Sequence, residues 1–378
     1  MARASGKYRH IPGVVQNTDI GQLIDTADME HRLILWLTIW GVSLLYPPAV
    51  RGADSVELVL YNWANYMPPE LLDAFQKETG VQVRELYYSS DESKQALLAE
   101  TQGVGLDLII SAGASMREYV IPEWIDALQP ELLPHLSNVD EHWMRKFGEV
   151  EGYGVPLLWG TIGIAYRSDK LPQPPSSWRD FFKPHHSLRQ KIMVIDDSAD
   201  AFGMALVALG YSMNATDLTQ VEAAGVLLEQ QKPYVAGYAY PLIDENSELI
   251  KGHIVMAMMY NGDAVGLHEL DPRVAFVAPA EGTNLWVDYI GVVKKSQHKE
   301  EAHQFIDFLL RPENAAKLSE FLHYASANKA TASKLSKEHL ENPDIYPPKN
   351  VMDKADTYKV ISPEVLKLRN QMFRSIKR

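Results

Sequence analysis

Short apolar runs alternate with amphipathic stretches along this chain, a pattern typical of α/β proteins. Residues 58–61 predict a buried strand, and residues 69–79 predict a helix with its apolar side chains on one face. Pro69 suits the first turn of this helix, and Gly80 is well placed to end it.

The alternation continues through residue 110. Residues 81–86 alternate apolar and polar positions as a strand does, residues 91–101 predict a second helix, and residues 106–110 predict another buried strand. Because this order is β-α-β-α-β, we expect a parallel sheet.

A second α/β pattern follows residues 152–160, which we interpret as a crossover. Residues 192–197 predict a strand that leads into a helix near residues 202–209, and residues 255–260 predict a further strand. Residues 300–323 have apolar positions at helical spacing.

This organisation predicts an α/β fold with two discontinuous lobes joined by hinge strands. We expect lobe 1 to comprise residues 54–159 and 286–327, and lobe 2 to comprise residues 160–285 and 328–378. A two-lobe layout of this kind creates a cleft at the hinge, where ligands commonly bind.

The first 53 residues have the features of an N-terminal extension followed by a signal peptide. Residues 29–52 combine a basic-edged start with the apolar run 33–45, and small residues near position 52 or 53 suit signal-peptidase cleavage. We expect translation to begin at Met29, and an uncleaved membrane anchor is the alternative interpretation.

The composition of the chain disfavours or excludes several classes of partner and site. The chain has 378 residues, 46% of them hydrophobic, and a net charge of −13, which disfavours nucleic acid as a partner. It contains no cysteine, which excludes disulfides, zinc-thiolate sites and the lipid attachment of a lipoprotein. A secreted protein without a lipid anchor is retained by an outer membrane, so we expect a periplasmic location.

Aromatic side chains follow the first predicted strand. Trp63 and Tyr66 lie where the carboxyl end of a strand in an open α/β sheet faces a ligand crevice. A tryptophan wall of this kind could cover the methylene chain of an organic cation. The alternative is that both rings pack in the lobe core.

Acidic residues follow two later strands. Asp197 and Asp200 could share one face at a helix start and hold an ammonium group, although capping of the helix is the usual role of such residues. Tyr260 and Asp263 flank an Asn-Gly pair, which normally forms a tight turn, and they could point into the same crevice.

The segment Trp286-Val287-Asp288 gives the clearest indication of a ligand-binding site in the sequence. Strand spacing puts Trp286 and Asp288 on one side, and an aspartate among apolar residues is costly to bury unless it is paired. Rings and carboxylates together suit a small organic cation.

Catalytic motifs are missing from the sequence. It has no G-x-S-x-G, P-loop or H-E-x-x-H motif, and His185-His186 lies in a polar stretch that favours solvation over metal binding. We therefore expect no enzyme activity, no cofactor and no metal, with an exported hydrolase as the less favoured alternative.

Several of these segments together resemble the spermidine/putrescine-binding periplasmic proteins, the solute-binding receptors of polyamine ABC transporters. The resemblance covers about residues 57–330. It is carried by Tyr61-Asn62-Trp63 with Tyr66, Val155-Pro156-Leu157-Leu158-Trp159-Gly160, Ser177-Trp178-Arg179-Asp180 with Pro184, Asp196-Asp197, Asn261-Gly262, Trp286-Val287-Asp288 and Phe308-Leu309-Leu310-Arg311-Pro312.

The resemblance implies a type II periplasmic binding protein fold and a ligand shell for a linear polyamine. Aromatic walls and carboxylates would form most of that shell. The implied ligand-binding residues are Trp63, Ala64, Tyr66, Ser111, Asp197, Asp200, Tyr260, Asp263, Trp286, Asp288 and Tyr324.

The shell also departs from the family pattern. The chain has Ser111-Ala112-Gly113 where spermidine binders tend to have Ser-x-Tyr, Tyr260 where a tryptophan is usual, and Asp200 where a glutamate is frequent. The preferred polyamine (spermidine, putrescine or norspermidine) stays open. The implied partner of this expected monomer is an inner-membrane ABC permease or, alternatively, a membrane-bound sensor such as a cyclic-di-GMP enzyme.

Overall fold

The computed structural model describes residues 56–88 and 91–378. The predicted signal peptide and the expected start at Met29 lie outside the described residues. Within them, none of the helices has the length and hydropathy that a membrane span requires.

The strands of the described chain are β1 (Glu57–Trp63), β2 (Gln82–Tyr88), β3 (Leu108–Ala112), β4 (Gly154–Arg167), β5 (Ile192–Val194), β6 (Val235–Tyr238), β7 (Met256–Tyr260), β8 (Val274–Val277), β9 (Leu285–Val292) and β10 (Ala325–Ser326).

The α-helices are α1 (Pro69–Thr79), α2 (Asp91–Thr101), α3 (Gly113–Val120), α4 (Glu141–Met144), α5 (Trp178–Phe182), α6 (Ser198–Ala208), α7 (Leu218–Gln231), α8 (Glu248–Lys251), α9 (Asn261–Leu270), α10 (Lys299–Leu309), α11 (Pro312–Leu322), α12 (Lys337–Glu341), α13 (Lys349–Met352) and α14 (Pro363–Ile376). Short 3₁₀ helices are η1 (Pro130–Leu132), η2 (Leu136–Asn138), η3 (Gly148–Val150), η4 (His186–Leu188), η5 (Lys232–Tyr234) and η6 (Lys329–Ser333).

The first lobe follows the predicted order of elements. Strand β1 pairs in parallel with β2 on one side and with β3 on the other, which confirms the parallel arrangement. Helix α1 begins with Pro69 and ends at Gly80, whose φ of 78° is the left-handed conformation that glycine adopts without strain. Strand β9 then pairs antiparallel with β3.

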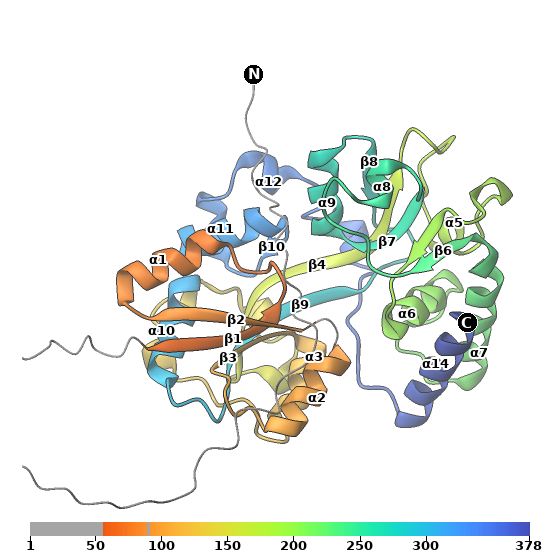
Figure 1. The fold of residues 1–378 in the computed structure, drawn as a ribbon. Coiled ribbons are helices and arrows are strands. Elements are labelled where there is room, and N and C mark those ends of the chain that lie inside the picture. The colour runs from red at the N-terminus through yellow and green to blue at the C-terminus, as the bar shows by residue number, and fades with distance from the viewer. Residues whose placement is uncertain (1–55, 89–90) are drawn as a thin grey trace, which may run out of the picture. The chain divides into compact units, whose positions relative to one another are not determined.

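Two long antiparallel strands, β4 and β9, connect the lobes (Figure 1). The first part of β4 pairs with β9 from Gly154↔Gly291 to Thr161↔Leu285. Its second part pairs with β7 and β8 in the second lobe, where β5 and β6 extend the sheet. All residues of β4 are buried. The predicted α/β fold with two lobes joined by hinge strands is therefore confirmed.

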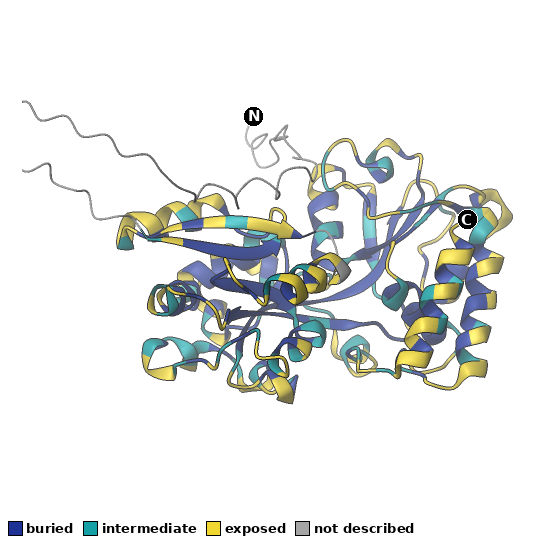
Figure 2. Cartoon of the chain, turned by 60° about the horizontal axis from the view of Figure 1, so that its bottom comes forward, coloured by how far each residue is buried: buried dark blue, intermediate teal, exposed yellow. Residues whose placement is uncertain are grey.

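Each lobe has an apolar core of its own. In the first, Phe75 lies edge-on against Phe305, with ring centroids 4.9 Å apart. In the second, Trp178, Phe182 and Phe202 are almost completely buried between helices and sheet. Burying one such side chain contributes about 1.5–3 kcal/mol. Figure 2 shows mostly buried strands, whereas the helices alternate buried and exposed positions.

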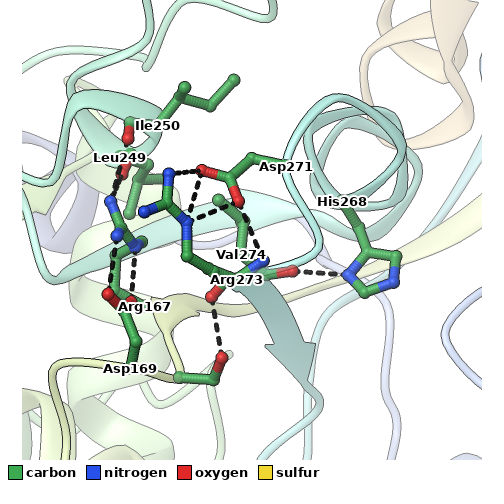
Figure 3. Close-up of polar contacts among 9 residues, drawn as sticks. Arg167, Asp169, Leu249, Ile250, His268, Asp271, Arg273 and Val274 are labelled. Atoms are coloured by element: carbon green, nitrogen blue, oxygen red, sulfur yellow. Dashed lines mark hydrogen bonds and ion pairs between the residues drawn. The ribbon is translucent and has the colours of Figure 1, made fainter.

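The end of β4 in the second lobe is fixed by a buried arginine (Figure 3). The Arg167 guanidinium donates to both carboxylate oxygens of Asp169, at 2.7 and 2.8 Å, and to the backbone carbonyls of Leu249 and Ile250, each at 2.9 Å. The Arg167 side chain is buried, whereas the Asp169 carboxylate is partly exposed to solvent. This cluster anchors helix α8 to the sheet, and we assign it a structural role.

The C-terminal segment contacts elements of both lobes. Tyr346 lies edge-on against Trp159 of β4, with ring centroids 5.9 Å apart, and Asn284 forms a parallel bridge with Asp356. Helix α14 then packs on the second lobe, where Phe373 belongs to its core. The residue ranges expected for the two lobes stay a prediction.

Candidate ligand-binding site

Three strands of the first lobe bring part of the predicted site together. Trp63 ends β1, Ser111 lies in β3, and Asp288 lies in β9 opposite Ala112. Ser111 is fully buried, Trp63 is half-buried, and Ala64 is exposed directly after β1. Trp63 and Ser111 lie at or near the carboxyl ends of parallel strands, as expected in an open α/β sheet, and the antiparallel strand β9 adds the Asp288 carboxylate from its interior.

Asp288 is a buried acid beside a buried tyrosine. Only 7% of the residue is exposed, and burial raises the pKa of the Asp288 carboxyl to about 7, although the nearby Lys94 ammonium lowers it. The Tyr66 hydroxyl lies next to this carboxyl but forms no hydrogen bond of normal geometry among the described residues. A polar group left in that state costs free energy unless a partner binds there.

Lys94 of α2 is a site residue that the sequence did not indicate. Its ammonium donates to Asp91 Oδ1 at 2.5 Å and to Ser111 Oγ at 2.7 Å. The same nitrogen lies 4.5 Å from the ring centroid of Tyr88 and 5.3 Å from that of Trp63. One cation is therefore already held against the ring and the hydroxyl that were predicted for the ligand.

A second acid, Asp200, lies in the first turn of α6. The Tyr260 hydroxyl donates to Asp200 Oδ2 at 2.9 Å, and the Tyr358 hydroxyl donates to Oδ1 at 2.8 Å. Burial raises the pKa of Asp200 to about 7, and the neighbouring Asp197 carboxylate raises it further against the two tyrosine hydrogen bonds. Asp197 caps α6 by accepting from the Ala199 and Asp200 amides at 2.7 and 3.0 Å.

A third acid, Asp263, lies in the first turn of α9. The Tyr240 hydroxyl donates to its carboxylate, the Tyr324 hydroxyl lies close enough to lower its pKa, and burial nevertheless raises the pKa of Asp263 to about 6. Tyr240 is itself fixed by the backbone amide of Tyr260, which donates to its hydroxyl at 3.2 Å.

The Asn-Gly pair at 261–262 starts helix α9, which excludes the tight turn that this dipeptide normally forms. The Asn261 side chain accepts from the Thr161 amide at 2.9 Å and donates to the Asp344 carbonyl at 2.7 Å. These long-range contacts fix Asn261 at the helix start, and they outweigh the local turn preference of the dipeptide. As a result Asp263 lies in the first helical turn.

Trp286 links the acids of the two lobes. Its ring lies edge-on to Tyr324, with centroids 4.6 Å apart, and to Tyr260, with centroids 6.0 Å apart. Burial raises the pKa of the Tyr324 hydroxyl, and the nearby charges of Asp263 and Asp288 raise it further. Edge-to-face packing of this kind is favourable for aromatic rings, and here it arranges them in a continuous series between the carboxyls.

Two glycines make room for these rings. A Cβ at Gly160 would lie 2.4 Å from the Trp286 ring, and a Cβ at Gly262 would lie 2.4 Å from the Tyr324 ring. Real side chains do not approach so closely, so any larger residue at either position would displace a ring.

The structure thus brings most of the predicted site residues into one connected cluster. Asp197 contributes to it by capping α6 and through its charge, while for Ala64 the structure gives only its exposed position after β1. The cluster members that the sequence did not indicate are Tyr88, Asp91, Lys94, Tyr240 and Tyr358.

Chemically, the cluster combines buried carboxyls with aromatic faces. Asp200, Asp263 and Asp288 are all held where burial disfavours their ionised forms, and Lys94 lies near Asp288. Such a site gains most from a cation that arrives and neutralises the acids, because aromatic faces and carboxylates both attract ammonium groups.

Comparison with known proteins gives the family. Residues 70–345 match the family model for bacterial extracellular solute-binding proteins. This chain is a bacterial extracellular solute-binding protein. It is 31% identical over 318 residues to the spermidine/putrescine-binding periplasmic protein of Salmonella typhimurium, and the aligned region covers 84% of this chain and 90% of that protein.

Two further proteins extend the comparison for this solute-binding protein. A norspermidine sensor of Vibrio cholerae is 27% identical over 326 residues, covering 86% of this chain and 89% of that protein. The solved structure of the Streptococcus pneumoniae spermidine/putrescine ABC transporter substrate-binding protein superposes with a TM-score of 0.75 at 25% identity, covering 86% of this chain and all of that one. The predicted resemblance to polyamine-binding proteins is confirmed.

Proposed function

We propose that this solute-binding protein is a periplasmic receptor for a linear polyamine. The observation that carries the proposal is the set of three carboxyls, the buried Asp200 and Asp288 and the partly exposed Asp263, joined by a series of aromatic rings. A polyamine offers what this set lacks, namely ammonium groups separated by methylene chains that can lie against rings.

The roles of individual residues follow from their surroundings. Trp63, Tyr66, Trp286 and Tyr324 would cover the methylene chain, with Ala64 at the edge and Ser111 as a polar contact. Asp288 would hold one ammonium group. Asp200, which accepts a hydrogen bond from Tyr260 and is assisted by the charge of Asp197, would hold the other end together with Asp263.

Closure of the lobes would couple to binding. Tyr260 comes from β7 of the second lobe and Asp288 from the hinge strand β9, so a ligand that contacts both stabilises the arrangement in which they lie close together. A ligand shifts such an equilibrium only through a difference in affinity for the two states. Binding without turnover is the expected activity.

A thermal-shift panel tests the proposal. The purified protein is melted with putrescine, spermidine, norspermidine and spermine, and with 1,4-butanediol as a neutral analogue of putrescine. At a ligand concentration of about 100 times Kd, binding stabilises the folded state by about 2.7 kcal/mol. We expect at least one amine to raise the melting temperature and the diol to leave it unchanged. No shift with any amine would refute the proposal.

Delivery to an inner-membrane ABC permease is the downstream role we favour. A membrane-bound sensor is the second candidate, because a norspermidine sensor is among the relatives. Uptake of labelled polyamine by cells that lack this protein separates the two roles: a transport receptor requires the protein for uptake, whereas a sensor leaves uptake intact and changes the output of its signalling partner. The signal peptide and the monomeric state belong to the same proposal, and N-terminal sequencing and size-exclusion chromatography of the exported protein test them.

A further inference from the structure

A buried lysine occupies one end of the candidate ligand site. The Lys94 side chain is completely inaccessible to solvent, which is rare for lysine unless its charge is paired. It comes from α2 and reaches inward, although a lysine in an amphipathic surface helix normally points to water. A buried ammonium in this position therefore requires specific compensation.

The compensation is the set of groups that a ligand ammonium would use. Asp91 supplies a carboxylate at 2.5 Å, and Ser111 supplies a hydroxyl oxygen at 2.7 Å. Tyr88 and Trp63 supply aromatic faces at 4.5 and 5.3 Å from the nitrogen. Both Ser111 and Trp63 belong to the predicted ligand shell.

Further charges face the same ammonium. Burial lowers the pKa of the Lys94 ammonium, while Asp91, Asp288 and Glu118 favour its charged form. Tyr119 lies 5.9 Å from the nitrogen and covers another side. The position is therefore surrounded by acidic and aromatic groups, and its positive charge comes from the protein itself.

We propose that Lys94 acts as a built-in substitute for one ammonium group of the ligand and thereby makes this receptor selective for diamines over triamines. This inference rests on the proposed polyamine function. An added ammonium beside Lys94 would meet a like charge in a water-poor setting and would compete for Asp91 and Ser111. A diamine of the putrescine class needs only the acids that remain, Asp288 at one end and Asp200 with Asp263 at the other.

The experiment compares the affinities of putrescine and spermidine by titration calorimetry in the wild type and in Lys94→Met. Methionine is similar in length, apolar and compatible with a helix, so it opens the ammonium position without a large cavity. Lys349→Met is the matched control, since it removes the same charge from a lysine that is exposed on α13 and paired with Asp353. Lys94→Gln repeats the test with a side chain that can still hydrogen-bond to Ser111.

We expect the wild type and Lys349→Met to bind putrescine at least about tenfold more tightly than spermidine, and Lys94→Met to shift the ratio of the two affinities toward spermidine by about tenfold or more. A wild type that prefers spermidine would overturn the inference even if the Lys94 variants fail to fold. A ratio that stays within about twofold in folded Lys94→Met would overturn it as well. A wild type that binds no polyamine would refute the proposed function itself, and this inference with it.

Discussion

Replacement of Asp288 by asparagine is the most informative single perturbation of the candidate site. The change keeps the shape of the side chain and removes its charge. In the ligand-free protein, burial raises the pKa of Asp288 from 3.8 to about 7. Because a tenfold change in an acid constant corresponds to about 1.4 kcal/mol, ionised Asp288 carries a cost of about 4 kcal/mol in the empty site.

A bound ammonium group relieves that cost, so the variant should lose much of this gain. Truncation of one partner of a buried charge pair typically costs about 2–5 kcal/mol. We therefore expect Asp288→Asn to weaken binding of the preferred polyamine by about 30-fold to several thousand-fold at pH 8. Titration calorimetry measures the change directly.

The control is Asp73→Asn, which removes the same charge from an exposed position on α1. We expect its affinity to match that of the wild type. Should Asp288→Asn bind within about twofold of the wild type, the assignment of Asp288 as an ammonium partner would be wrong.

Three further predictions follow from the same site. Folding raises the pKa of Asp288 from 3.8 to about 7, so this residue contributes stability that is complete below about pH 4 and is lost as pH rises to about 7. Chemical denaturation of the ligand-free protein should show that the stability of Asp288→Asn relative to the wild type is higher at about pH 8 than at about pH 4, and equal differences at the two pH values would contradict this. Polyamine binding should release protons from Asp200, Asp263 and Asp288 at pH 6 but few protons at pH 8.5, so the affinity should fall as pH decreases. Calorimetry in buffers of different ionisation enthalpy measures the number of protons released, and the absence of proton release at about pH 6 would speak against ligand contact with these acids. Gly160→Ala should displace the Trp286 ring and the Asn261 side chain, because the added Cβ would clash with both, and it should weaken binding by about tenfold or more. Tryptophan fluorescence and calorimetry are the readouts, and an unchanged affinity would show that the position of this ring does not matter.

The order of elements was predictable because it depends on local patterns. Helix α1 has the predicted bounds, since Pro69 and Gly80 mark its two ends chemically. Helix α2 also has its predicted bounds. The helical stretch 300–323 was correctly recognised, but it is divided between α10 and α11 at Arg311-Pro312, where proline begins the second helix.

The candidate site was predictable where residues follow strands. Trp63, Tyr260 and Asp288 lie in or at the ends of strands whose pattern is clear in the sequence. The same rule could have indicated Tyr88, which ends β2. The rule could not indicate the hydrogen-bond partner of each site residue, because these partners come from distant segments of the chain.

Lys94 and Tyr358 show this limit. Nothing in the local pattern separates Lys94 from an ordinary exposed helical lysine, and only the tertiary position of α2, which packs on β2, brings it to Ser111. Tyr358 reaches Asp200 across 158 positions of sequence separation, from a segment without regular secondary structure. Contacts of this kind depend on tertiary structure, which overrides local preference.

A crystal structure of the protein with its preferred polyamine would test the central claim most directly. We expect the ligand to lie extended beside Trp63 and Trp286, with one ammonium group within hydrogen-bond distance of the Asp288 carboxylate and the other near Asp200 or Asp263. A polyamine bound elsewhere, with Asp288 and Trp286 free of contact, would contradict the account.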